Sequence, residues 1–296
     1  MNRARRRATA TAAALGMTLA VAACSPDDAP EDAASTSAAG AGVAQTAGAL
    51  PGGHVHGVAI DPEDDLVYLA THEGLYRYGT SGPTRVGPVI DLMGFTVAGP
   101  GHFYASGHPG PGTDLPDPVG LLESTDSGAT WTPLSRQGES DFHALTASGQ
   151  VVVAFDGVAL RSTEDGTAWR DLPVPVAPFA MDISPDGSTI VVTHRDGPIR
   201  STDAGATWGP LTDAPLLQVV DWADDRTVLG VTPDGQVAVS EDAGATWASA
   251  ARVEGAPHAL AVRRGTTGAL RVVVATADTL LESVDLAAGF APLAGS

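Results

Sequence analysis

Lysine is absent from this chain of 296 residues, and all sixteen basic residues are arginine. Chemistry that depends on a lysine side chain, such as a Schiff base, a P-loop or a Ser–Lys dyad, is therefore excluded. Cys24 is the one cysteine, so an internal disulfide framework and a cysteine-based metal site are excluded as well. Charged residues make up 17% of the chain, whereas glycine (35), proline (22) and hydrophobic residues (43%) are plentiful. This composition suits a sizeable core connected by many turns.

The N-terminus has the pattern of an export signal. Arginines at positions 3, 5, 6 and 7 precede an apolar run at 8–23, which is shorter than a membrane-spanning helix requires. The run ends in Leu19-Ala-Val-Ala-Ala-Cys24, which resembles the lipobox of bacterial lipoproteins. The resemblance implies that residues 1–23 are removed and that Cys24 is lipidated, which would anchor the protein to the cell membrane on its extracytoplasmic side. The alternative is an ordinary signal peptide with an incidental cysteine.

The chain left after such cleavage is strongly acidic. It would keep 12 basic and 35 acidic residues, a net charge of −23. A surface of this sign repels nucleic acid and anionic lipid headgroups, so we expect neither as a partner. Residues 24–49 hold almost no large apolar side chains and predict a disordered tether between the lipid and a domain at 50–296, which we expect to be monomeric.

One motif recurs through that domain in the form S-x-D-x-G-x-x-W. Its copies begin at Ser124, Ser162, Ser201 and Ser240, and a decayed copy begins at Ser283, with spacings of 38, 39, 39 and 43 residues. A fixed period near 40 residues is typical of a propeller or a solenoid. In each copy the Ser and Asp side chains can accept hydrogen bonds from the backbone of a tight turn, and the Gly tolerates positive φ. The Trp would pack between neighbouring repeats.

The motif resembles the Asp-box (BNR) repeat of sialidases and related propellers. The resemblance implies that its residues are structural and lie on hairpins opposite the active face. Glu164 replaces the Asp in the second copy, and we expect its longer side chain to loosen that turn. The structural positions are Ser124, Asp126, Gly128, Trp131, Ser162, Glu164, Gly166, Trp169, Ser201, Asp203, Gly205, Trp208, Ser240, Asp242, Gly244 and Trp247.

The intervening segments alternate as β-strands do, and no helix is predicted between residues 50 and 296. The pattern predicts an all-β fold, a six-bladed β-propeller with blades of about 40 residues. A seventh blade would need a further segment, for which the sequence shows no strands. Inner strands are predicted at 55–60, 95–99, 143–147, 180–184, 217–221 and 258–262, and second strands at 66–70, 102–106, 151–155, 189–193, 227–231 and 270–276. How the ring closes is left open.

Propeller topology sorts the eight histidines. In each four-stranded blade the loops that enter the first strand and those that follow the second lie on one face. Seven histidines map to that face and His102 maps to the other. The mapped residues are His54, His56, His72, His108, His143, His194 and His258, together with Glu73, Asp114, Asp141, Asp156, Asp196 and Asp278. A cluster of imidazoles and carboxylates at the channel mouth could bind a divalent transition metal or a polar ligand such as a glycan. The alternative is a channel lining that merely holds water.

Residues 106–120 make the connection after the second strand of blade 2 longer than its counterparts. Long loops in compact domains are often binding loops, and the prolines of this one favour a fixed shape. The alternative is a tolerated surface insertion. The candidate ligand- or metal-binding residues are His54, His56, His72, Glu73, His108, Asp114 and His143.

Phrases such as His54-Val-His-Gly57 and Asp141-Phe-His-Ala-Leu145 are similar to those of bacterial Asp-box lipoproteins described as glycosyl-hydrolase-like or exo-α-sialidase-like. Sialidases share an Arg-Ile-Pro segment, an arginine triad and a Tyr nucleophile. This chain has no Arg-Ile-Pro, its tyrosines lie in or beside predicted strands, and Arg195 alone is placed in a face loop. Sialidase activity is therefore not expected.

The leading hypothesis is a lipid-anchored propeller that binds a metal ion or a glycan at a His-rich channel mouth. The alternatives are a glycoside hydrolase that uses a carboxylate pair such as Glu73 and Asp114, and a membrane-associated assembly or scaffold factor.

Overall fold

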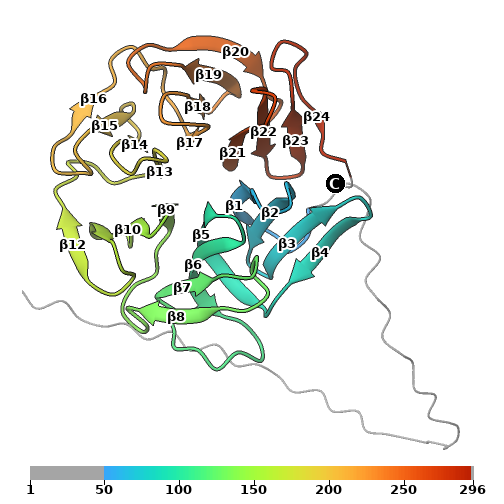
Figure 1. Ribbon diagram of the computed structural model, residues 1–296, viewed down its shortest axis with the longest axis vertical. Coiled ribbons are helices and arrows are strands. Elements are labelled where there is room, and N and C mark those ends of the chain that lie inside the picture. Colours follow the sequence, from blue (N-terminus) through green and yellow to red (C-terminus); the bar gives the residue numbers. More distant parts are fainter. Residues whose placement is uncertain (1–49, 295–296) are drawn as a thin grey trace, which may run out of the picture. The chain divides into compact units, whose positions relative to one another are not determined.

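The computed structural model describes residues 50–294, in which all regular secondary structure is β. Six four-stranded antiparallel sheets stand in a ring, as Figure 1 shows, so the predicted six-bladed β-propeller is confirmed. No helix in this part of the chain could cross a bilayer. The predictions for residues 1–23, Cys24 and the tether fall outside the described residues.

Each blade takes four strands in sequence order, running from the channel to the rim. The first three blades are β1 (Val55–Ile60), β2 (Val67–Thr71), β3 (Gly74–Gly79) and β4 (Gly82–Val86); β5 (Ile90–Gly99), β6 (His102–Pro109), β7 (Leu121–Ser124) and β8 (Thr132–Ser135); and β9 (Ala144–Ser148), β10 (Val151–Phe155), β11 (Leu160–Thr163) and β12 (Trp169–Leu172). The last three are β13 (Ala180–Ile183), β14 (Ile190–Thr193), β15 (Ile199–Ser201) and β16 (Gly209–Pro210); β17 (Val219–Trp222), β18 (Val228–Val231), β19 (Gln236–Ser240) and β20 (Ala248–Arg252); and β21 (Ala259–Arg264), β22 (Leu270–Ala275), β23 (Leu280–Ser283) and β24 (Ala291–Pro292).

The ring closes without exchanging a strand between its ends. Blade 1 is built from β1 to β4 and blade 6 from β21 to β24, so each terminal blade is complete by itself. One apolar cluster joins them, with Val55 and Leu69 from blade 1 packed against Val273 and Leu280 from blade 6. Closure therefore rests mainly on burial of apolar side chains between the two sheets.

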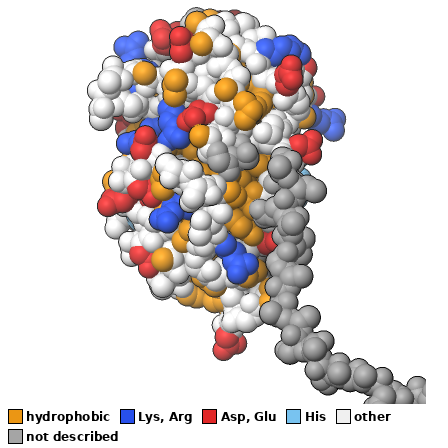
Figure 2. Space-filling view, turned by 90° about the vertical axis from the view of Figure 1, so that its right-hand side faces the viewer, with side chains coloured by type: hydrophobic (Ala, Val, Ile, Leu, Met, Phe, Trp, Pro, Cys, Tyr) orange, Lys and Arg blue, Asp and Glu red, His pale blue; other side chains and the backbone are white. Residues whose placement is uncertain are grey.

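Charged side chains reinforce this junction at the surface. Arg263 of β21 pairs with Asp65 of the β1–β2 turn, and Arg271 of β22 lies 3.6 Å from the same carboxylate. Figure 2 shows the side of the molecule toward the outer strands β4 and β24 of these two blades, where acidic and basic side chains are scattered between apolar ones. Partly exposed ion pairs of this kind contribute little each, so they adjust a contact that apolar packing makes.

The recurring motif forms the turn that the sequence predicts in three of its copies. Ser124 Oγ accepts a hydrogen bond from the Gly128 N–H at 2.8 Å and donates to Asp126 Oδ1 at 2.8 Å. Asp126 Oδ1 in turn accepts from the Thr130 N–H at 2.8 Å. The same bonds recur in the copies that begin at Ser201 and Ser240.

The copy in blade 3 differs from the expectation. Glu164 does not loosen the turn, because the bonding shifts by one residue. Thr163 Oγ1 lies 3.1 Å from Asp165 Oδ1, and Asp165 accepts from the N–H groups of Thr167 (2.8 Å) and Ala168 (2.7 Å). These backbone donors lower the pKa of Asp165 to about 2. A neighbouring Asp therefore supplies the carboxylate that Glu164 cannot place.

The motif tryptophans pack across blade boundaries, as predicted. The Trp169 Nε1 in blade 3 donates to Ser135 Oγ of blade 2 at 2.9 Å. The Nε1 groups of Trp208 and Trp247 donate within their own turns, but these rings pack against clusters that include Leu172 of blade 3 and Val191 of blade 4, respectively. Each motif therefore contributes to the interface with the preceding blade.

Candidate metal centre at the channel mouth

Three histidines converge at the ends of the two inner strands of blade 1, β1 and β2. His54 precedes β1, His56 lies within β1 and His72 follows β2. Their ligand nitrogens all lie within 4.8 Å of one another, and His56 Nε2 is 3.2 Å from His72 Nε2. The sequence-predicted pair His54-x-His56 thus acquires its third imidazole from the neighbouring strand.

Strand pairing explains this convergence. Val55 is buried and pairs with Thr71 across β1 and β2, so the flanking His54 and His56 turn to the opposite face beside His72. The register shifts between Val55 and Gly57, and an irregularity of this kind re-aims the side chain that it contains. Here that side chain is His56.

Two further residues surround the three imidazoles. Asp91 of β5 accepts from His72 Nδ1 at 2.8 Å, which leaves His72 Nε2 facing His56. The ring of His258, just before β21, lies 5.1 Å from the His54 ring, and its Nδ1 is buried without a hydrogen-bond partner. Blades 1, 2 and 6 therefore all contribute to one mouth.

The imidazoles depress each other's proton affinity. Burial, followed by the neighbouring His72 and His54, lowers the pKa of His56 to about 4. Burial, followed by His258 and His72, lowers the pKa of His54. Both rings are therefore uncharged at neutral pH, which is the form that binds a metal.

A second group of residues lies on the same face at blades 2 and 3. His108, at the end of β6, has Nδ1 at 2.6 Å from Asp117 Oδ1 and Nε2 at 3.2 Å from Asp141 Oδ2. His143 Nε2 approaches the same Asp141 oxygen at 2.5 Å. The other oxygen, Asp141 Oδ1, is buried without a hydrogen-bond partner.

The two groups meet at Asp91. Asp91 and His108 are direct partners across β5 and β6. The hydrogen bond to Asp117 is the largest cause that raises the pKa of His108, and the charge of Asp91 adds to it. The charge of Asp91 also opposes the fall in the pKa of His56 that burial causes. His143 also lowers the pKa of His56, so the groups interact across the mouth. Six of the seven mapped histidines therefore lie around the same channel mouth.

Other residues mapped to this face do not join the cluster. Glu73 and Asp114 are exposed, and within residues 50–294 neither carboxylate bonds to a histidine. His194 lines a separate hollow with Pro198 and Leu211. Asp156 accepts from the Val158 and Ala159 N–H groups and pairs with Arg161, which is a structural role. His102 bonds to Glu123 at 2.8 Å near the β5–β6 turn, as its mapping away from the face predicts.

Asp91 and Asp117 were missed by the sequence interpretation, for different reasons. The inner strand of blade 2 was predicted to begin at residue 95, but β5 begins at Ile90, and only the longer strand places Asp91 opposite His108. Asp117 lies in the long loop after β6, where the sequence favoured Asp114. The loop is tied down by the Val119 N–H, which donates to Gly107 O at 2.9 Å, and it delivers Asp117 rather than Asp114 to His108.

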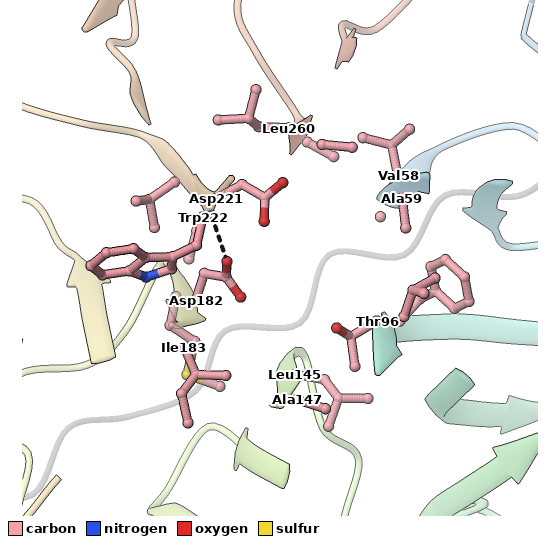
Figure 3. Close-up of a pocket in the computed structure, with 18 of the residues that line it drawn as sticks. Val58, Ala59, Thr96, Leu145, Ala147, Asp182, Ile183, Asp221, Trp222 and Leu260 are labelled. Atoms are coloured by element: carbon pink, nitrogen blue, oxygen red, sulfur yellow. Dashed lines mark hydrogen bonds between the residues drawn. The ribbon is translucent and has the colours of Figure 1, made fainter. Parts of the chain in front are cut away.

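A pair of carboxyl groups in the central channel was also missed. Figure 3 shows Asp182 and Asp221 side by side among Val58, Ala59, Leu145 and Leu260. The channel that these residues line has a volume of about 420 Å³. Asp182 Oδ2 accepts from the Trp222 N–H at 2.8 Å, and Asp221 accepts from the Val262 N–H. Each carboxyl group thus bridges its own inner strand to that of the next blade.

The surroundings of this channel pair favour one proton held between the two carboxyl groups. Burial, followed by the charge of Asp182, raises the pKa of Asp221 well above its usual range. Burial raises the pKa of Asp182 as well, but hydrogen bonds from Asp221, Thr146 and the Trp222 N–H oppose that rise, so Asp182 is the member of the pair better suited to hold the charge. The segment Asp182-Ile-Ser-Pro-Asp-Gly187 continues from β13 into a hairpin turn, in which the Gly187 N–H donates to Ser184 O at 2.8 Å.

The four tyrosines, all within residues 50–294, lie away from the histidines at the channel mouth. Tyr68 and Tyr104 are buried in the sheets, and burial raises the pKa of each hydroxyl to about 12. Tyr78 is buried as well, and Tyr76 packs against the cluster that joins blades 1 and 6. None is positioned as a nucleophile beside the histidines.

No family model and no curated protein sequence matches this chain. Its similarity to solved structures shows the fold. A xyloglucanase of family GH74 from Xanthomonas campestris is 18% identical with a TM-score of 0.52, over 83% of this chain and 46% of the enzyme. The nidogen/laminin complex contains a chain that is 14% identical with a TM-score of 0.57, over 75% of this chain and 90% of that one.

A third similar structure is the extracellular domain of a hybrid two component system from B. thetaiotaomicron, 12% identical with a TM-score of 0.52, over 78% of this chain and 32% of that one. The chain therefore spans less than half the length of the xyloglucanase and of this third protein. The fold and these similarities define the chain as a six-bladed β-propeller with glycoside-hydrolase-like structural neighbours.

Proposed function

We propose that this protein is a lipid-anchored, extracytoplasmic β-propeller that binds a divalent transition metal ion through His54, His56 and His72. The observation that carries the proposal is the convergence of three imidazoles whose ligand nitrogens lie within 4.8 Å of one another. Imidazole is a preferred ligand of zinc, copper, nickel and iron.

The spacing of the nitrogens is suited to an ion with tetrahedral or similar coordination. Two nitrogens that each lie about 2.0–2.1 Å from zinc are about 3.3 Å apart in a tetrahedral site. His56 Nε2 and His72 Nε2 are already 3.2 Å apart. Little movement of these two rings is therefore needed to receive an ion.

Asp91 supports the same assignment. A metal-binding histidine usually donates its other ring nitrogen to a carboxylate, which orients the ring and strengthens the ligand. His72 Nδ1 lies 2.8 Å from Asp91 Oδ1, and the Nε2 atom faces the other two histidines. With three protein ligands, a fourth position stays open for water or for a small ligand such as a sugar hydroxyl.

The anchor and location rest on the sequence. The arginines before an apolar run and the Leu19-to-Cys24 segment support export and lipidation, and the acidic charge suits a protein exposed to solvent. Labelling with a lipid precursor tests the anchor: the wild-type chain should be labelled and Cys24→Ser should not.

The glycoside hydrolase alternative has fold similarity to the GH74 enzyme as its support. Fold alone does not carry an activity to this chain, and Glu73 and Asp114 stand apart from the histidine contacts. A panel of chromogenic glycosides tests this alternative, and turnover that Glu73→Gln abolishes would favour it over simple metal binding. For the assembly-factor alternative, the corresponding test is recovery of a defined membrane complex on the anchored chain.

The metal proposal is tested by titrating the chelator-treated protein with Zn²⁺ in a calorimeter. We expect His56→Ala combined with His72→Ala to weaken binding at this site at least 100-fold, because two of its three ligands are lost. His102→Ala is the matched control, since His102 bonds to Glu123 outside the cluster and its loss should leave binding unchanged. Unchanged Zn²⁺ affinity and stoichiometry in the double variant would contradict the proposal.

A further inference from the structure

We infer that the same face holds a second divalent metal ion, bound by His108, Asp141 and His143. These residues are contributed by the end of β6 and by the segment that enters β9, so they are distinct from the three ligands in blade 1. Two imidazoles and one carboxylate form a ligand set suited to zinc, iron or manganese.

Both imidazoles already contact the same carboxylate oxygen. His108 Nε2 lies 3.2 Å and His143 Nε2 lies 2.5 Å from Asp141 Oδ2. The side chain of His143 is 56% exposed, so its ring is free to move back by the roughly 0.8 Å that a tetrahedral ion between these atoms requires. Asp141 is held more firmly, with 19% of its side chain exposed, and its Oδ1 is buried without a partner. That oxygen lacks the bond that buried carboxylates normally have, and an ion bound through both Asp141 oxygens would supply it.

The second group repeats the construction of the first. His108 Nδ1 is directed at Asp117 as His72 Nδ1 is directed at Asp91, at 2.6 Å and 2.8 Å respectively. In both cases the carboxylate leaves Nε2 facing the other ligands, which is the orientation that metal-binding histidines adopt. The long loop after β6 has the role of delivering Asp117, and the Gly138 N–H holds it by donating to Pro118 O at 2.8 Å.

The surrounding backbone is rigid enough to keep this geometry. Phe142, between the two ligands Asp141 and His143, is fully buried, and its N–H donates to Ser106 Oγ at 3.0 Å. The His143 N–H donates to Phe155 O at 3.1 Å. Because alternate residues of an extended segment point the same way, the buried Phe142 directs both flanking side chains to the mouth.

The local charge also favours a cation. Asp91, Asp117 and Asp141 lie together, and within residues 50–294 none of them pairs with an arginine. Their partners are histidines, which carry a full positive charge only when protonated. A divalent ion would neutralise carboxylates that otherwise repel one another.

The experiment is a Zn²⁺ titration of the chelator-treated full chain, followed by calorimetry and by native mass spectrometry. We expect two ions per wild-type chain. His108→Ala combined with His143→Ala should retain one ion, and His56→Ala combined with His72→Ala should also retain one. The His102→Ala control should retain both.

Three outcomes separate this inference from the proposed function. One ion in the wild-type chain, lost in the His56/His72 variant and kept in the His108/His143 variant, would overturn the second site and leave the first. One ion lost in both double variants would indicate a single shared site and would also overturn the inference. Two ions in the wild-type chain that both persist in the His108/His143 variant would overturn it as well.

Asp117→Asn provides a test that does not remove a ligand. Because Asp117 orients His108 without binding the ion, we expect two ions per chain with about 10–100-fold weaker affinity for one of them. Unchanged affinities would contradict the assigned arrangement. Circular dichroism of each variant establishes that the propeller is folded.

Discussion

At the scale of single residues, the unusual feature of this propeller is how strongly its polar groups depend on partners from another blade. His72 is oriented by Asp91 of blade 2, and Asp182 of blade 4 is bonded to the Trp222 N–H of blade 5. Such contacts place charge in partly buried positions, where the protonation state of one group sets that of its neighbour.

Asp221 provides a pH-dependent prediction at this scale. Its pKa in the folded protein is raised by burial and then by Asp182, so the folded chain retains a proton that the unfolded chain releases. The stability due to this group is therefore complete below the unfolded pKa and is lost as the pH rises through the folded pKa. Among the described residues, Asp182 is the ionisable group that acts on Asp221, and Thr146 donates its hydroxyl hydrogen to Asp182.

The substitution Asp221→Asn should remove the loss of stability that accompanies deprotonation of Asp221. The amide can still accept from the Val262 N–H and donate to Asp182, as the protonated acid does. We expect the variant to be at least as stable as the wild type at pH 7. Its unfolding free energy, measured by urea unfolding at a series of pH values, should decline less above pH 4 than that of the wild type. Asp278→Asn, on an exposed loop, is the control for loss of one carboxylate. A variant with the wild-type pH profile would contradict the assignment of the proton to Asp221.

At the scale of elements, the repeated turn connects each blade to the one before it. The motif glycines face a leucine of the preceding blade: a Cβ at Gly128 would lie 2.4 Å from Leu75 Cδ2, and one at Gly205 would lie 2.7 Å from Leu172 Cδ1. The motif therefore needs glycine for two reasons, a positive φ and a close approach.

Gly128→Ala separates these two reasons when it is compared with Gly138→Ala. Both glycines have positive φ (+85° and +71°), but nothing lies within 4 Å of a Cβ at Gly138. We expect the control to lose about 1 kcal/mol of unfolding free energy from the backbone alone, and Gly128→Ala to lose about 1–3 kcal/mol more through overpacking. Chemical denaturation measures both. Equal losses would mean that the contact with Leu75 is not important.

At the scale of the whole molecule, the ring is held shut by packing between the first and last blades. Each of these blades is complete, so the closure has no shared strand whose hydrogen bonds would join the two ends of the chain. The apolar cluster that contains Val55, Val273 and Leu280 must supply that stability instead.

Leu280→Ala tests this closure. The side chain is fully buried at the junction, so its truncation should reduce the unfolding free energy by about 2–5 kcal/mol. Val158→Ala is the control, since Val158 is 88% exposed and its loss should change stability by less than about 0.5 kcal/mol. Thermal unfolding compares the two variants, and a similar small effect in both would show that closure does not depend on this cluster.

The sequence alone predicts the blade number, the turn chemistry of three motif copies and seven histidines on one face, of which the structure brings six together. Those features follow from a repeat near 40 residues and from alternation along strands, which are local patterns. Tertiary structure alone decided that Asp91 and Asp117 support the histidines, that Asp182 and Asp221 lie side by side, and how the ring closes. Each of these depends on side chains from different blades or on the course of one long loop, and such contacts exist only after the ring has formed.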